Sequence, residues 1–387
     1  MRNVAELVDP LQLPSLLQPS IEAASDEFDV LGDIPDALRV ELRDVGAFRL
    51  LTPREFGGSE TPLTDVLRIY EGFGRIDASI GWLVWNANFG FVGALLSQSG
   101  AAQIWAGGTE PVLANSGSPG FSVPADGGYQ LSGQWKIVSG IGAADWFIAV
   151  GVVAENGQPR ITKSGSPDIR LYAVRKDQLK IGDTWNVSGM RATGSNDVVV
   201  EDAFIPADLV TPPIDQPARI DRALYRGFYP ALVFPGCSAV SLGVAQSAID
   251  GMVTLASSKK AFAGGTVAES ARTQYVIAKS ETAVHAARLL LFSAADALQS
   301  AAEDGAAVTL EQRALLRSAM THAAQVSREA LVAMYELGSS SALYRGSALE
   351  RSFRDGMVAL QHANQSDLFL EAAGRVRLGL APGLPLF

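Results

Sequence analysis

Three histidines and one cysteine are the residues of this 387-residue chain best suited to proton transfer or nucleophilic chemistry. His285, His322 and His362 are far apart and show no HExxH or other paired spacing of a metal site. Cys237 lies in the apolar stretch 233–240, where a thiol is more often a small buried hydrophobe than a nucleophile. An isolated histidine, with an unperturbed pKa near ~6.5, can still exchange a proton at neutral pH. The sequence therefore predicts no bound metal and leaves histidine as a candidate for proton transfer.

Common nucleotide-binding and nucleophile motifs are missing. Gly72–Gly74 lacks the third glycine of a dinucleotide fingerprint, and Gly140–Gly142 leads from one predicted strand into another instead of into a helix. Ser116–Gly120 comes close to the GxSxG of serine hydrolases but contains a proline and is typical of a turn. The sequence also has no P-loop. A nucleotide cofactor, if the protein uses one, must bind in some other way.

Composition and charge exclude several classes of partner. The net charge is −10 and no Lys/Arg-rich run occurs, so we expect no binding to nucleic acid or to anionic membranes. The most membrane-like segment, 80–96, is too short and too polar for a confident span. Acidic residues interrupt the N-terminus early, which is unlike a secretory signal. These features predict a cytoplasmic protein.

Three zones follow one another along the chain. Up to residue 110, apolar residues recur three and four apart, as in 34–51 and 62–75, which predicts helices, with Thr64 available as an N-cap. Between 111 and 221, segments rich in β-branched and aromatic residues predict strands, and Asp126–Gly128 predicts a hairpin turn. The predicted strands are 128–131, 133–138, 146–153, 169–174 and 197–205.

From residue 222 onward, long Ala- and Leu-rich segments predict a helix bundle. They are 238–257, 267–302, 310–337 and 347–370. The segments 238–257 and 310–337 are apolar on more than one face, so part of their surface is expected to lie at a subunit interface. The predicted fold class is α+β, with an N-terminal helical domain (1–110), a small central β domain (111–221) and a C-terminal four-helix bundle with its tail (222–387).

This order of elements, with the residues at its joints, resembles the acyl-CoA dehydrogenase superfamily over nearly the whole chain. The match is closest to the two-component flavin monooxygenases, which hydroxylate small aromatic molecules with reduced flavin. The stretches that carry the resemblance are Pro53–Gly58, Gly128–Gly140 followed by Ala144–Trp146, Trp185–Asp197 ending at Phe204–Pro206, and Arg354-Asp355 with His362 seven residues later. The resemblance implies an acyl-CoA dehydrogenase-like fold whose β domain, a small barrel or sandwich, stacks on the flavin.

The same resemblance assigns residues to a flavin site. Ser139 would lie at the flavin N5 edge, where a hydroxyl can donate a hydrogen bond; alternatively it merely ends a strand. Asn115 and Ser116 would hold the isoalloxazine carbonyls. The expected cofactor-binding residues are completed by Arg191, Thr193 and Ser195 beside the flavin, and by Lys259, Phe262, Gln274, Gly338 and Ser339 in the bundle, where a neighbouring subunit approaches the pyrophosphate. Arg191 could instead support its turn through backbone carbonyls. Both FMNH2 and FADH2 remain possible as the reduced flavin.

The region after Arg354-Asp355 decides between two chemistries. Acyl-CoA dehydrogenases need a carboxylate base, which the family places here or early in the first bundle helix. Neither 354–365 nor 234–238 contains a glutamate, and His362 stands where the oxygenase branch carries a histidine. The resemblance therefore implies a monooxygenase that uses reduced flavin and O2 to hydroxylate a small aromatic or heteroaromatic substrate through a C4a-(hydro)peroxyflavin, with His362 and Ser139 catalytic. The alternative for His362 is an ordinary helix histidine.

The expected substrate pocket departs from the family at one point. Many members have a second histidine after the tryptophan-bearing helix, whereas here Trp82 is followed by Asn86 and Asn88. An asparagine can hydrogen-bond a substrate hydroxyl but cannot act as a base. This leaves heteroaromatic and other non-phenolic substrates open.

Two other functions remain as alternatives. One is an acyl-CoA dehydrogenase with Asp355 or Glu371 as a relocated base, although Asp355 is more readily explained by an ion pair with Arg351 or Arg354. The other is a non-catalytic assembly protein that kept the bundle and lost the flavin. For the oxygenase, the resemblance implies a homotetramer. It also implies a separate NAD(P)H-flavin reductase as partner, because no nicotinamide-binding motif is visible.

Overall fold

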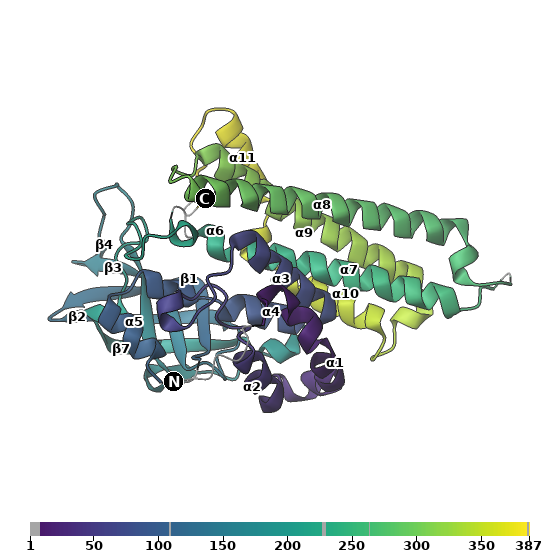
Figure 1. Cartoon of the computed structure of the whole chain (residues 1–387), viewed down its shortest axis with the longest axis horizontal. Helices are drawn as coiled ribbons and strands as arrows, with labels where there is room; N and C mark the ends of the chain where they lie inside the picture. The colour runs from purple at the N-terminus through teal and green to yellow at the C-terminus, as the bar shows by residue number, and fades with distance from the viewer. Residues whose placement is uncertain (1–7, 108–109, 227–229, 263, 385–386) are drawn as a thin grey trace.

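The structure, a computed structural model, describes residues 8–107, 110–226, 230–262, 264–384 and 387. A β-sheet lies at one end of the molecule's long axis, and the long helices of the C-terminal bundle extend from it toward the other end (Figure 1). The N-terminal helices, in purple to blue, lie against both. One cluster of buried apolar side chains runs through all three parts, so they share a core.

The N-terminal part is helical, as expected. Its helices are α1 (Leu13–Leu31), α2 (Asp36–Asp44), α3 (Leu63–Ile76), α4 (Ala78–Ala87) and α5 (Gln98–Trp105). The helix predicted over 34–51 is confined to α2, because the chain turns after it at Gly46, which has a φ of 90°. Thr64 does not cap α3, since it lies inside that helix. Asp77 caps α4 by accepting from the N–H groups of Ser79 and Ile80.

The central part forms one sheet with strand order β4-β3-β1-β2-β7-β6, and β5 also pairs with β3, along residues 146–152. The strands are β1 (Leu113–Ala125), β2 (Gly128–Val138), β3 (Trp146–Glu155), β4 (Gln158–Pro159), β5 (Ile169–Arg175), β6 (Lys180–Ile181) and β7 (Asn196–Pro206). The two strands predicted over 128–138 are a single strand, β2. The predicted hairpin turn is confirmed, because Ala125 pairs with Gly128. Only β1 and β3 pair in parallel among the described strands.

The C-terminal part is the expected bundle with one correction. Its helices are α6 (Pro230–Val233), α7 (Pro235–Ser258), α8 (Ala271–Glu303), α9 (Leu310–Gly338), α10 (Ala348–Ala359) and α11 (Leu368–Arg377). The helix predicted over 347–370 is therefore two helices, α10 and α11. The break occurs because the backbone of His362 is extended and its side chain caps the short turn Ala363–Gln365. This break brings His362 out of regular helix.

Close packing of α3 on α7 joins the N-terminal part to the bundle. A Cβ atom on Gly243 would lie 2.1 Å from the carbonyl oxygen of Glu71, and one on Gly74 would lie 2.6 Å from that of Val240. The stretch Pro230–Ser258 is long and apolar enough to cross a membrane, but 83% of its most apolar window is buried inside the protein. Its apolar character is thus explained by its place in the core.

Candidate active site

Ser139 directly follows β2, at a point where the strand is irregular. The pairing of β2 with β7 shifts register between Trp135 and Val138, which marks a β-bulge. Ile137 lies in this bulge with a φ of 56°, an uncommon conformation for a β-branched residue, and its side chain is exposed. Its N–H donates to Asp197 Oδ1 at 3.1 Å. The bulge therefore sets the direction in which Ser139 leaves the sheet.

Three buried hydroxyl groups and one indole form a continuous hydrogen-bonded chain. Trp82 Nε1 donates to Ser139 Oγ at 3.2 Å. Ser139 Oγ lies 2.8 Å from Ser195 Oγ, which in turn lies 2.6 Å from Thr193 Oγ1. Thr193 Oγ1 donates to the carbonyl oxygen of Met190 at 2.8 Å. The three hydroxyl-bearing residues are at most 3% exposed. The sequence-predicted residues Ser139, Thr193 and Ser195 are thus brought together.

His362 packs against two tryptophans of α4. Its ring centroid is 5.5 Å from that of Trp82 and 5.3 Å from that of Trp85, both in edge-to-face orientation. The two tryptophans are three residues apart, which places them on one face of the helix. Trp85 Nε1 donates to the carbonyl oxygen of Val233 at 2.7 Å. Gly236 allows this contact, because a Cβ atom there would lie 2.1 Å from Trp85 Cδ1.

The imidazole of His362 is neutral at physiological pH. Burial, together with the nearby positive charge of Arg317, lowers its pKa to about 4. Nδ1 accepts a hydrogen bond from the backbone N–H of Asn364 at 3.3 Å, so the neutral ring carries its hydrogen on Nε2. The sequence-based expectation used the ordinary value near ~6.5. In the folded chain His362 instead offers an N–H donor at neutral pH.

Asn88, which the sequence placed in the substrate pocket, has a structural role. It is 2% exposed, and its Oδ1 accepts from the N–H of Leu50 at 2.7 Å. Its Nδ2 donates to the carbonyl oxygens of Ala47 and Val84, both at 2.7 Å. The side chain therefore fastens the end of α4 to the loop after α2, and both of its N–H donors are used, so it has none left for a substrate.

Asn86 has a different environment from Asn88. Its Oδ1 is buried without a hydrogen-bond partner among the described residues. Its backbone carbonyl accepts from Asn115 Nδ2 at 2.7 Å, which ties α4 to β1. The next residue, Ser116, makes a long hydrogen bond of 3.4 Å to the carbonyl oxygen of Lys136. Asn86 Oδ1 is thus an acceptor that a bound molecule could satisfy, because buried polar atoms are normally paired.

Arg191 supports its own turn through backbone carbonyls. Its Nε donates to the carbonyl oxygen of Asp29 at 2.9 Å, and one terminal nitrogen donates to that of Val187 at 3.2 Å. The turn lies close to α10, because a Cβ atom on Gly189 would lie 2.6 Å from the carbonyl oxygen of Arg354. Arg191 therefore makes the backbone contacts that were expected if it supports the turn instead of binding the flavin.

The remaining predicted cofactor residues lie at the end of the bundle far from the sheet, where α7 and α9 end and α8 begins (Figure 1). Lys259 Nζ donates to the carbonyl oxygen of Gly338 at 3.1 Å, beside Ser339. Phe262 is fully exposed, and the exposed Gln274 donates to the carbonyl oxygen of Ala268. Within one chain, these residues are not brought together with Ser139.

Sequence reasoning missed part of a buried ionic network, namely its extension to Asp77 and Met190. Asp355 lies 3.8 Å from both Arg351 and Arg354, which confirms the predicted ion pairs, and its Oδ1 also accepts from the N–H of Met190 at 2.8 Å. Arg351 also pairs with Asp77, the N-cap of α4, at 3.2 Å. Burial raises the pKa of Asp355 to about 7, assisted by the charge of Asp77 and opposed by the arginines. The network joins α4, α10 and the 190–195 turn. The i, i+3, i+4 spacing of Arg351, Arg354 and Asp355 was the available signal.

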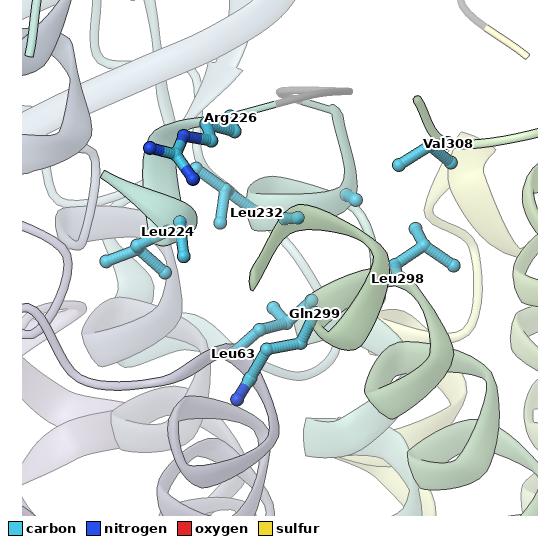
Figure 2. Close-up of a pocket in the computed structure, with 10 residues that line it drawn as sticks. Leu63, Leu224, Arg226, Leu232, Leu298, Gln299 and Val308 are labelled. Atoms are coloured by element: carbon cyan, nitrogen blue, oxygen red, sulfur yellow. The ribbon is translucent and has the colours of Figure 1, made fainter. Parts of the chain in front are cut away.

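The described part of the chain has a pocket beside α4 and another beside the start of α3, and the two have different linings. One is beside Ser139 and Gly140, with Arg39, Leu83 and Leu113 in its wall. The other lies between the start of α3, α6 and the end of α8, and Figure 2 shows that aliphatic side chains such as Leu63 and Leu298 line it. None of the predicted site residues lines this second pocket.

Comparison with known proteins identifies the family and supports the overall fold. Residues 236–366, which include α8, α9 and α10, match the family described as acyl-CoA dehydrogenase, C-terminal domain. An indole-3-acetate monooxygenase of Acinetobacter baumannii is 30% identical, over 93% of this chain and 91% of that protein. The flavin-dependent monooxygenase oxygenase subunit HsaA of Rhodococcus jostii is 29% identical, over 91% and 94%. The crystal structure of a 3-HSA hydroxylase from Rhodococcus sp. RHA1 matches with a TM-score of 0.89 at 26% identity, covering 96% of this chain and 98% of that one.

The chain therefore belongs to the flavin-dependent monooxygenases that share the acyl-CoA dehydrogenase fold.

Proposed function

We propose that this oxygenase uses reduced flavin and O2 to hydroxylate a small aromatic or heteroaromatic substrate beside Trp82, Trp85 and His362. The observation that carries the proposal is that one side chain, Trp82, contacts both Ser139 and His362. The hydroxyl expected at the flavin edge and the histidine expected at the substrate are thus linked through one indole. The relatives support an aromatic substrate, since one is an indole-3-acetate monooxygenase.

The residues at the ends of β1 and β2 fit a flavin. Asn86 Oδ1 is buried and lacks a partner among the described residues, and Asn115 and Ser116 lie beside it on β1. These groups offer the mixture of donors and acceptors that an isoalloxazine edge requires. Ser139, at the end of β2, would complete this set. The flavin, when bound, supplies the electrons that activate O2.

His362 would act as a positioned hydrogen-bond donor. Because Nδ1 is engaged by Asn364, the Nε2–H is the group that a substrate oxygen or the reacting oxygen would meet. Trp82 and Trp85 hold the imidazole in place through edge-to-face contacts. Donation from a neutral imidazole stabilises developing negative charge on oxygen without requiring a protonated ring.

The dehydrogenase alternative has less support. Asp355 is held by Met190 and two arginines behind the site, and Glu371 is exposed on α11. Neither carboxylate lies beside the tryptophan pair with a free position from which to remove a substrate proton.

A homotetramer would complete the flavin site. Ser139 follows β2 and contacts α4, whereas the Lys259–Phe262 region lies at the end of the bundle far from the sheet, so we expect a second copy of the chain to bring this region to the flavin (Figure 1). Phe262 and Tyr275 are exposed apolar residues at the far end of the bundle, which suits contact with a second copy. Light scattering at micromolar concentration is expected to give a tetramer; a monomer would contradict this assembly. Phe262→Asp should weaken flavin binding about tenfold, whereas Val30→Asp, at an exposed apolar position on α1, should not.

The electrons are expected to come from a separate NAD(P)H-flavin reductase, because the sequence shows no nicotinamide-binding motif.

 The chain would be cytoplasmic, where such a reductase operates. The test is to supply the purified chain with substrate, O2, flavin and NADH, with and without a flavin reductase. Hydroxylated product is expected only when the reductase is present. Turnover with NADH alone would reject the two-component assignment.

A further inference from the structure

The hydrogen-bonded chain from Trp82 to Met190 has a fixed direction. An indole N–H can only donate and a carbonyl oxygen can only accept, so both ends of the chain are defined. Each hydroxyl between them has one hydrogen. Thr193 gives its hydrogen to Met190, so the hydrogen in the 2.6 Å contact must come from Ser195. Ser195 has then used its hydrogen, so Ser139 must donate in the 2.8 Å contact.

This direction leaves Ser139 with an acceptor and no free donor. Its hydrogen points to Ser195, and one of its two lone pairs receives the N–H of Trp82. The group that remains for a ligand is the second lone pair. Ser139 lines the pocket beside Gly140, whereas Thr193 and Ser195 do not line it, so their hydroxyls contribute through Ser139 and not through contacts of their own with a cofactor.

We propose that Thr193 and Ser195 are positioning residues that hold Ser139 as a hydrogen-bond acceptor and thereby favour reduced over oxidised flavin. The inference rests on the proposed function, in which Ser139 meets the flavin N5 edge. Reduced flavin carries a hydrogen on N5 and can donate it to Ser139. Oxidised flavin has only a lone pair at N5, so two acceptors would face each other.

Binding oxidised flavin would require the chain to reverse. If Ser139 donates its hydrogen to N5, Ser195 must donate its own hydrogen to Ser139. The 2.6 Å contact between Ser195 and Thr193 then has a hydrogen only if Thr193 donates to Ser195 and gives up its hydrogen bond to Met190. Each route loses one buried hydrogen bond, which corresponds to about a fivefold difference in affinity. Water cannot compensate, because the hydroxyls are buried.

Thr193→Val tests the proposal because it removes the hydroxyl and nearly keeps the side-chain shape. The carbonyl oxygen of Met190 would keep two donors, Trp185 Nε1 at 3.1 Å and the backbone N–H of residue 193 at 3.1 Å. Ser195 would then be free to donate to Ser139, and Ser139 to a ligand. The measurement is the dissociation constant of oxidised flavin in air and of reduced flavin under anaerobic conditions, by titration followed by fluorescence.

The expected result is that Thr193→Val binds oxidised flavin about fivefold more tightly than the wild type, with less than a twofold change for reduced flavin. Thr193→Ser, which restores the hydroxyl, should return the wild-type ratio of the two constants. Ser122→Ala is the matched control: it deletes another buried hydroxyl of the same sheet, bonded to Tyr172, and should leave the ratio unchanged.

A wild-type ratio in folded Thr193→Val would overturn the proposal. If that variant does not fold, Ser195→Ala provides the same test, since it also frees the hydrogen of Ser139. A wild-type protein that binds neither form of flavin would instead refute the proposed function. The two failures are therefore distinguishable.

Discussion

Trp82 donates its indole N–H to Ser139 Oγ at 3.2 Å, although the two residues are 57 positions apart. The same ring meets His362 edge to face, so one side chain orients a hydroxyl at the end of β2 and an imidazole after α10.

Trp82→Phe should remove the hydrogen bond from the ring to Ser139 and keep the contact with His362. Phenylalanine keeps most of the ring packing but cannot donate to Ser139. We expect the fraction of consumed NADH that appears as hydroxylated product to fall severalfold in the reductase-coupled reaction, with more hydrogen peroxide released. Trp105→Phe, which alters a ring stacked on Phe56, is the control and should leave this fraction unchanged. Unchanged coupling in Trp82→Phe would show that the indole N–H has no part in the reaction.

His362→Asn should slow hydroxylation without unfolding the protein. Asparagine can still accept from Asn364, so the turn after α10 should survive, but the Nε2–H is lost. Hydroxylation is expected to fall by about 10²-fold, the usual scale for this kind of assistance, and peroxide release to rise. His285→Asn, at an exposed position of α8, should behave as the wild type. Wild-type rate and coupling in His362→Asn would make this histidine a packing residue.

The low pKa of His362 predicts the response of the reaction to acid. Since the ring titrates at about 4, its neutral form persists throughout the range from pH 5 to 8. The single-turnover rate of hydroxylation should therefore show no inflection near pH ~6.5, the ordinary histidine value. An inflection there that disappears in His362→Asn would contradict the buried environment of the ring.

Asp355 should make stability depend on pH in the opposite sense from an ordinary carboxylate. Its pKa is raised to about 7 from a usual value of 3.8. The contribution of Asp355 to the free energy of unfolding is therefore complete below pH 3.8 and is lost as the pH rises through 7. Asp355→Asn, which can still accept from Met190, removes this loss. Its melting temperature relative to the wild type should therefore rise between pH 5 and pH 8. Asp215→Asn is the control: hydrogen bonds lower the pKa of Asp215, so it titrates below this range.

The two asparagines of α4 should respond differently to truncation. Asn88→Ala would leave the N–H of Leu50 and the carbonyls of Ala47 and Val84 without their partner, which should cost about 2–4 kcal/mol of unfolding free energy. Asn86→Ala removes an oxygen that has no partner among the described residues and should change stability by less than about 1 kcal/mol. Urea unfolding measures both. Equal losses of stability would mean that Asn86 is also structural.

The sequence by itself determined the order of the elements. Richness in β-branched and aromatic residues in 146–153 and 169–174 marked strands of a sheet, and the long Ala- and Leu-rich segments marked the helices of the bundle. These are local patterns, because side chains alternate across a strand and recur every three to four residues on a helix. The sequence also shows that 354–365 contains no glutamate, and this absence predicted that the protein is not a dehydrogenase.

Tertiary structure decided what each polar residue does. Asn86 and Asn88 look alike in sequence, but only the loop after α2 makes Asn88 a structural residue. Local pattern also failed at His362, where a continuous helix was predicted and the chain breaks instead.

The properties of the site depend on contacts between distant segments. Thr193, Ser195 and Ser139 acquire a common direction only because the 190–195 turn packs beside the end of β2. The pKa of His362 is set by burial against α4 and by the charge of Arg317 on α9. Burial, hydrogen-bond direction and electrostatic potential arise from groups far apart in the chain, so no local pattern of residues contains them.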